Sequence, residues 1–262
     1  MLDSIHLNEK ELLYVSMLNN IDNIWGINDP FIDMDEESIR MDVLRMQMSL
    51  LQKGYALSEE ENQFSINPNL SRLVSQCASA NHIFIFSSDE MEKSKSVLRC
   101  FAGENGIIRF AFGNEVSFSE ITKDQLYREL IDEFGESDTP VPRDCLITSS
   151  SRLKRLGSLS RNRFIQELRD LGCADDLSTV IADGLQGNSS FRILLCFEMG
   201  ESIKGTPVDK LVSIHSPSGN LVAKAFWGSN PDAVCFTRMD KQHLQNELHR
   251  ILDRIDEESG LV

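Results

Sequence analysis

The chain has 262 residues, with 41 Asp plus Glu against 26 Lys plus Arg, so its formal net charge is −15. That charge excludes a general coat for nucleic acid or anionic membranes, because both surfaces attract positive protein charge. With 41% hydrophobic and 26% charged residues, the composition is that of an ordinary globular protein rather than a disordered one.

The first eighty residues predict the order helix, helix, hairpin, helix. Helices are expected to start at Asn8, Asp35 and Asn67-Pro68, since each carries a residue typical of a helix N-terminus. Residues 55–66 have a polar centre between two short apolar ends, which favours a hairpin. This order is close to that of winged-helix domains.

The second of these helices holds three methionines. Its core stripe is predicted to be Ile39, Val43, Met46 and Leu50. Met41 and Met48 are then the exposed pair, and methionines at a surface suit an adaptable binding site.

From His82 onward the pattern changes to strands. Strands are predicted over 82–86, 96–101, 107–112 and 115–121, followed by a helix over 123–134 and a linker over 135–142. The second half is predicted to repeat this order of strands and closing helix. It has helices over 160–171 and 175–185, strands over 191–197, 209–215, 220–227 and 233–239, and a final helix from Asp240 to about Ile255.

The repeat is supported by an alignment without gaps at an offset of 118. Six of the nineteen pairs from Val116 to Phe134 are identical, about one being expected by chance: Val116/Val234, Phe118/Phe236, Lys123/Lys241, Leu126/Leu244, Glu129/Glu247 and Leu130/Leu248.

The expected fold class is therefore α+β. Two duplicated halves, each of helices, four strands and a closing helix, join into a central antiparallel sheet with pseudo-two-fold symmetry, flanked by helical bundles. We expect one domain over 1–262. Its first half, 1–135, holds a winged-helix-like segment (8–80), strands (82–121) and a helix (123–134); its second half, 143–262, holds helices (151–187), strands (190–239) and a helix (240–257).

The sequence contains no recognisable catalytic, phosphate-binding or metal-binding motif. The five histidines lack zinc-ligand spacing, no glycine-rich phosphate loop is present, and the six scattered cysteines fit reduced, mostly buried thiols. We therefore expect no enzyme, no cofactor and no metal, with a hydrolase-like enzyme as a third possibility. No long apolar segment or leader pattern is seen, so a cytoplasmic location is expected.

We expect the surface to serve partner binding. Candidate contact residues are apolar side chains in paired loops and at a strand end: Met91, Met199, Ile203 and Trp227. A basic segment runs from Arg143 to Arg163 and fits either an acidic partner or a solvated helix face. Residues 1–63 carry a charge of 4 − 13 = −9, which opposes DNA binding by the winged-helix-like segment.

Three stretches, together with the duplicated order, resemble the EspG-like chaperones of the type VII (ESX) secretion system. They are Leu50-Leu51-Gln52-Lys53-Gly54-Tyr55, then Ile66-Asn67-Pro68-Asn69-Leu70 with Leu73, and the strand His82–Phe86. The resemblance spans almost the whole chain as a pattern of order and apolar spacing.

The resemblance implies a cytosolic chaperone or adaptor that keeps helical type VII secretion substrates soluble and competent for export. Its partners would be helical secreted proteins, without nucleic acid or membrane insertion, and the chain would be a monomer or weak homodimer. The alternative is a winged-helix-like transcriptional or regulatory protein that acts through protein contacts.

Overall fold

The computed structural model describes residues 4–22, 24, 29–59, 63–88, 96–112, 116–135, 141, 144–200, 205–225, 230 and 232–257. Within these ranges, no helix combines the length and the apolar character that crossing a membrane requires. The chain forms two compact units, which are described separately. Unit 1 comprises 1–83, 99–122 and 199–205, and unit 2 comprises 84–98, 123–198 and 206–262.

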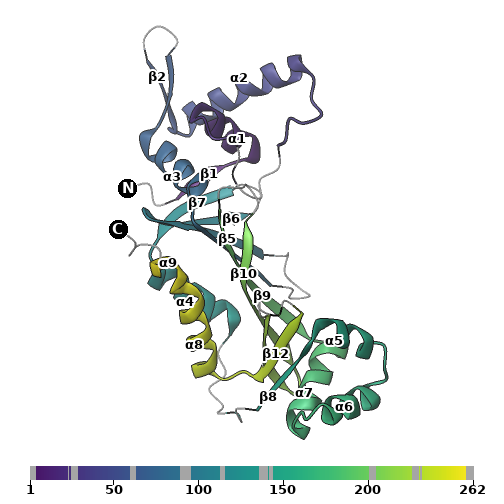
Figure 1. Ribbon diagram of the computed structural model, residues 1–262. Helices are drawn as coiled ribbons and strands as arrows, with labels where there is room; N and C mark the ends of the chain where they lie inside the picture. The colour runs from purple at the N-terminus through teal and green to yellow at the C-terminus, as the bar shows by residue number, and fades with distance from the viewer. Residues whose placement is uncertain are drawn as a thin grey trace. The chain divides into compact units, whose positions relative to one another are not determined.

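The fold is α+β, with ten strands in an antiparallel sheet (Figure 1). Their order is β1-β7-β6-β5-β4-β9-β10-β11-β12-β8. The two predicted meanders, β4 to β7 and β9 to β12, are therefore confirmed as runs of neighbouring strands. The sheet order adds two strands that the sequence reading missed, β1 and β8, one at each end.

Unit 1 contains the helix, helix, hairpin, helix order that was predicted. The elements are α1 (Glu9–Leu18), α2 (Glu36–Gln52), β2 (Ala56–Glu59), β3 (Gln63–Ile66) and α3 (Pro68–Ala78). Asn8, Asp35 and Asn67 each accept a hydrogen bond from a backbone N–H of the helix that they cap. These local signals fix the helix starts because they satisfy backbone donors that have no partner within the helix.

The strands of the first meander are β4 (His82–Ser88), β5 (Ser96–Gly103), β6 (Gly106–Phe112) and β7 (Val116–Ile121). β4 and β5 contribute residues to both units. In unit 1, β1 (Ile5–Leu7) extends this sheet by pairing with β7. Three phenylalanine rings, Phe101, Phe110 and Phe118, meet edge-on in series in the core of unit 1, with centroids 5.5 and 4.4 Å apart.

Unit 2 contains β8 (Cys145–Ser149), β9 (Ser190–Glu198), β10 (Thr206–Ser216), β11 (Gly219–Ala225) and β12 (Ala233–Arg238). Its helices are α4 (Lys123–Phe134), α5 (Ser150–Leu156), α6 (Arg161–Asp170), α7 (Asp175–Gln186), α8 (Lys241–Leu252) and α9 (Arg254–Glu257). The core includes α6 and α7 side chains packed with Leu221 and Phe236. On its other helices, α4 contacts α8, and the Tyr127 ring stacks on His249 at 4.2 Å.

Several elements of the structure correspond in position at the offset of 118 residues. α4 and α8 start and end at positions that differ by 118 residues, as the identities predicted. The missed strands also match: β1 places Ile5 opposite Phe118, and β8 places Leu146 opposite Phe236, the equivalent phenylalanine. The two edge strands are therefore paired in matching registers with β7 and β12.

Asp232 holds the start of α5 in unit 2. The Ser150 and Ser151 hydroxyls both donate to its carboxylate, the second at 2.7 Å, and the Ser151 backbone N–H donates at 3.1 Å. These donors, led by the Ser150 hydroxyl, lower the pKa of Asp232 to about 2. Ionised Asp232 therefore ties the turn before β12 to α5.

This tie predicts a specific loss of stability in acid. Because the pKa of Asp232 is lower in the folded chain than in an unfolded one, its contribution is complete above about pH 4 and disappears as the pH falls through about 2. A carboxyl carbon titration by NMR should show a midpoint near 2. In the Asp232→Asn variant, the loss of stability that Asp232 causes between about pH 4 and pH 2 should be absent from the acid unfolding curve. An NMR titration midpoint near pH 4 for Asp232 would contradict the tie.

Candidate functional site

Of the four predicted partner-contact residues, the described ranges include Met199. Met91, Ile203 and Trp227 lie outside them. Met199 follows β9, is half-buried, and donates its backbone N–H to the Asn81 carbonyl at 2.7 Å. The Asn81 N–H donates in turn to the Ala102 carbonyl at 2.9 Å, so the start of the 199–205 loop is anchored within unit 1.

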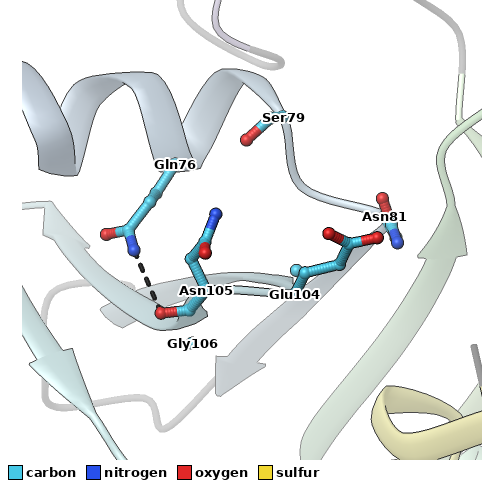
Figure 2. Close-up of a pocket in the computed structure, with 7 residues that line it drawn as sticks. Gln76, Ser79, Asn81, Glu104, Asn105 and Gly106 are labelled. Atoms are coloured by element: carbon cyan, nitrogen blue, oxygen red, sulfur yellow. Dashed lines mark hydrogen bonds between the residues drawn. The ribbon is translucent and has the colours of Figure 1, made fainter. Parts of the chain in front are cut away.

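Asn81 also lines a polar hollow of about 280 Å³ in unit 1 (Figure 2). The end of α3 forms one wall and the β5–β6 turn forms the other; the lining residues are Gln76, Ser79, Asn81, Gly103, Glu104, Asn105 and Gly106. The Gln76 amide donates to the Asn105 carbonyl at 3.0 Å across the hollow. Gly106 has φ +122°, a backbone conformation that side chains rarely adopt, so the tight turn depends on this glycine.

The lining of this hollow offers little for catalysis. Glu104 is its single carboxylate, and no thiol or imidazole accompanies it there. A nucleophile with its base, or a pair of carboxylates, cannot be assembled from these seven residues. The hollow suits hydrogen bonding to a polar group rather than bond cleavage.

Helix α2 carries an exposed apolar face. Four side chains recur at intervals of three, four and three residues, and their exposed fractions are Met41 48%, Leu44 51%, Met48 61% and Leu51 37%. We call these four residues the α2 seam. Surface apolar residues normally occur singly, so a row of four along one helix indicates a contact surface.

The opposite face of α2 packs into unit 1. Met46 and Leu50 are buried, which confirms the predicted division of the methionines into one core residue and an exposed pair. Asp42 lies beside them, bonded to the Lys10 ammonium, and this bond is the main reason that its pKa is lowered. Sequence reasoning missed Leu44 and Leu51 of the seam, although their spacing from Met41 and Met48 was visible.

In the basic segment from Arg143 to Arg163, one described side chain forms an ion pair and the others are exposed to solvent. Arg143 lies outside the described ranges. Arg161 on α6 donates to Asp183 at 2.6 Å, which raises the pKa of the arginine and lowers that of the aspartate. The remaining basic side chains are exposed on α5 and α6: Arg152, Lys154, Arg155 and Arg163. Part of this segment therefore has a structural role, and part is a solvated basic surface.

The cysteines follow the predicted pattern in most positions. Cys77, Cys100, Cys173 and Cys196 are buried free thiols, and desolvation raises the pKa of Cys196 to about 12. Cys145 is exposed on strand β8, and Cys235 is half-buried on strand β12. Over the ranges given above, no group of three or more His, Cys, Asp or Glu side chains is placed to hold a metal ion.

The arrangement of sheet and helices is similar to the fold of a solved type VII secretion chaperone. The chain matches the Mycobacterium tuberculosis type VII secretion chaperone EspG5, solved in complex with a PE25–PPE41 dimer, with a TM-score of 0.67. The match covers 95% of this chain and 96% of that one at 11% sequence identity. The resemblance expected from the sequence is thus confirmed at the level of the fold.

A second solved structure carries no argument. HtdX, also of Mycobacterium tuberculosis, aligns over 90% of this chain and 98% of its own at 8% identity, but its TM-score of 0.13 supports no conclusion. No protein-family model matches the sequence, and no curated protein matches it.

Proposed function

We propose that this chain is a non-enzymatic, cytoplasmic chaperone or adaptor that binds a helical substrate of a type VII secretion system. The observation that carries the proposal is the EspG5 fold, matched over 95% of the chain. EspG5 was solved with a PE25–PPE41 dimer bound; for this chain we propose a partner of the same general kind, a helical secreted protein.

The surface chemistry supports binding rather than catalysis. An exposed row of methionine and leucine side chains lies on α2, and methionine adapts to partners of varied shape. We further propose that the loop starting at Met199 contributes to partner contact, together with Met91, Ile203 and Trp227. The hydrogen bond from the Met199 N–H to the Asn81 carbonyl supports this proposal, because it holds the first residue of the segment in a fixed position. The Met199 side chain is half-buried, so part of it is exposed for contact.

The proposal is tested by isolating the tagged chain from its native cytoplasm at moderate salt and weighing the intact complexes. We expect near-equal amounts of this chain and one helical type VII substrate. The substrate should precipitate when this chain is removed from it. Changing Met199 to Glu should reduce recovery at least tenfold, while Leu57→Glu, at a solvent-exposed position on β2, should leave it unchanged. Recovery of the chain without such a substrate would contradict the proposal.

We also propose that the chain is one domain, whose halves, 1–135 and 143–262, are related by a pseudo-two-fold axis. The equivalent edge strands β1 and β8 support this relation. Within the first half, the order α1, α2, β2, β3, α3 supports the description winged-helix-like. The same order favours the second candidate function, a regulator that acts through protein contacts; recovery with RNA polymerase would favour that candidate.

A further inference from the structure

Two cysteines lie on neighbouring strands of unit 2. Cys145 is the first residue of β8 and Cys235 lies in β12, which is drawn beside β8 in Figure 1. The antiparallel register places Cys235 opposite Ile147, so the two cysteines are diagonal neighbours across the strand pair. Because side chains alternate between the faces of a sheet, both thiols lie on the face opposite to Leu146 and Phe236, which belong to the core beneath α6 and α7.

The two thiols differ in their access to solvent. Cys145 is exposed, as is Ile147 on the same face, whereas Cys235 is half-buried. Burial raises the pKa of Cys235; the Cys145 thiol, close enough to hydrogen-bond with it, raises it further, and the Lys224 ammonium opposes the rise. Cys235 is therefore held as a thiol at neutral pH, and Cys145 is the sulfur that a reagent in solution meets first.

The other polar side chains on this face are bonded among themselves. Lys224 on β11 lies opposite Cys235 and pairs with Glu247 on α8. The Thr237 hydroxyl on β12 is hydrogen-bonded to the His243 ring at 2.9 Å. The carboxylate and the imidazole on this side thus have partners of their own, while the two sulfurs have each other.

We propose that Cys145 and Cys235 form a reversible disulfide between β8 and β12 when the chain meets a peroxide. Disulfides in reducing compartments are mostly transient and redox-sensing, which agrees with a pair of free thiols held side by side. The proposal depends on the geometry of β8 and β12 and not on the proposed chaperone function.

The reaction with hydrogen peroxide takes place in two steps. The Cys145 thiolate attacks one peroxide oxygen, the O–O bond breaks, and the leaving hydroxide takes up a proton, so that a sulfenic acid and one water result. The Cys235 sulfur then attacks the Cys145 sulfur: the S–O bond breaks, the S–S bond forms, and the hydroxyl leaves with the Cys235 proton as a second water. The two thiols lose two electrons and two hydrogens, and the peroxide is reduced to water.

The position of the pair makes the disulfide easy to reduce again. Diagonal neighbours in a sheet have Cα atoms about 7–8 Å apart, whereas a disulfide requires about 4.4–6.8 Å. Strand β8 must therefore shift slightly toward β12, and it is the last strand in the sheet order, bonded to β12 alone among the described strands. Strained and exposed disulfides are the readily reduced ones, so the bridge should open in a thiol buffer.

Oxidation of the reduced, folded chain by a small excess of hydrogen peroxide tests the proposal. After alkylation of the remaining thiols in denaturant, trypsin should release residues 144–152 linked to residues 225–238, about 2 Da below the sum of the free peptides. Treatment with a thiol reductant should separate them. In Cys235→Ser, dimedone should trap Cys145 as its sulfenic acid several-fold more than in the unchanged chain, because the second thiol is absent.

A second pair of cysteines provides a matched control in the same molecule. Cys77 and Cys100 are both buried in unit 1, and burial, together with the nearby Cys100 thiol, raises the pKa of Cys77. This pair should stay reduced under the same treatment. Full alkylation of Cys145 and Cys235 after peroxide, linkage of either one mainly to a second copy, or equal linkage of Cys77 to Cys100 would overturn the proposal.

Discussion

Replacing Phe118 by Ala should lower the free energy of unfolding by about 4 kcal/mol, because the change leaves a cavity in a closed core. Phe118 is fully buried in unit 1, opposite Ile5 on β1 and opposite Phe110 on β6. Its ring meets the Phe110 ring edge-on at 4.4 Å, so the substitution also removes an aromatic pair. Urea unfolding followed by circular dichroism measures the loss.

Phe236, at the offset of 118 residues from Phe118, is its counterpart in unit 2. Phe236→Ala removes the equivalent ring, which lies opposite Leu146 and Ala223, and should cost about 3 kcal/mol. Hydrogen exchange should locate the loss of protection mainly in unit 1 for Phe118 and mainly in unit 2 for Phe236. Leu57→Ala, at an exposed position, should change stability by less than about 0.5 kcal/mol. Equal effects of the buried and exposed changes would contradict this account of the core.

Glu11→Ala should produce the second large effect, a loss of about 3 kcal/mol. The Glu11 carboxylate is fully buried and accepts from the Lys53 ammonium at 2.9 Å, the Asn8 N–H at 2.8 Å and the Ser49 hydroxyl. Lys53 also donates to the His6 carbonyl at 3.2 Å. One carboxylate therefore joins the end of β1, the start of α1 and the end of α2, and its removal takes away the acceptor of three part-buried hydrogen bonds.

A double substitution separates the charge from the packing. Replacing both Glu11 and Lys53 by Met should recover part of the stability lost in Glu11→Ala, because the second change also removes the Lys53 charge that the Glu11 carboxylate neutralises. Glu36→Ala is the control, since it breaks the exposed Glu36–Arg40 pair and should cost less than about 0.5 kcal/mol. A Glu11→Ala loss as small as that of the control would show that the network does not stabilise unit 1.

Most helices and strands could be predicted because their signals are local. The capping residues Asn8 and Asp35 marked helix starts, and the apolar period located the meander strands. The predicted linker over 135–142 falls almost wholly outside the described ranges, with Gly135 at its start having φ +72°. Of the predicted contact residues, Met199 is placed, and the α2 seam came from the structure.

The sequence by itself determined the amphipathic helices and the two meanders, because each depends on the spacing of residues that are neighbours along the chain. Tertiary structure alone decided the edge strands β1 and β8. A three-residue strand such as Ile5–Leu7 has too little pattern of its own, and it forms because β7 offers an unpaired edge whose backbone groups need partners. Packing likewise decided the face of α2 left exposed: the helix carries two apolar stripes, and its contacts with α1 and β2 determine which one is buried.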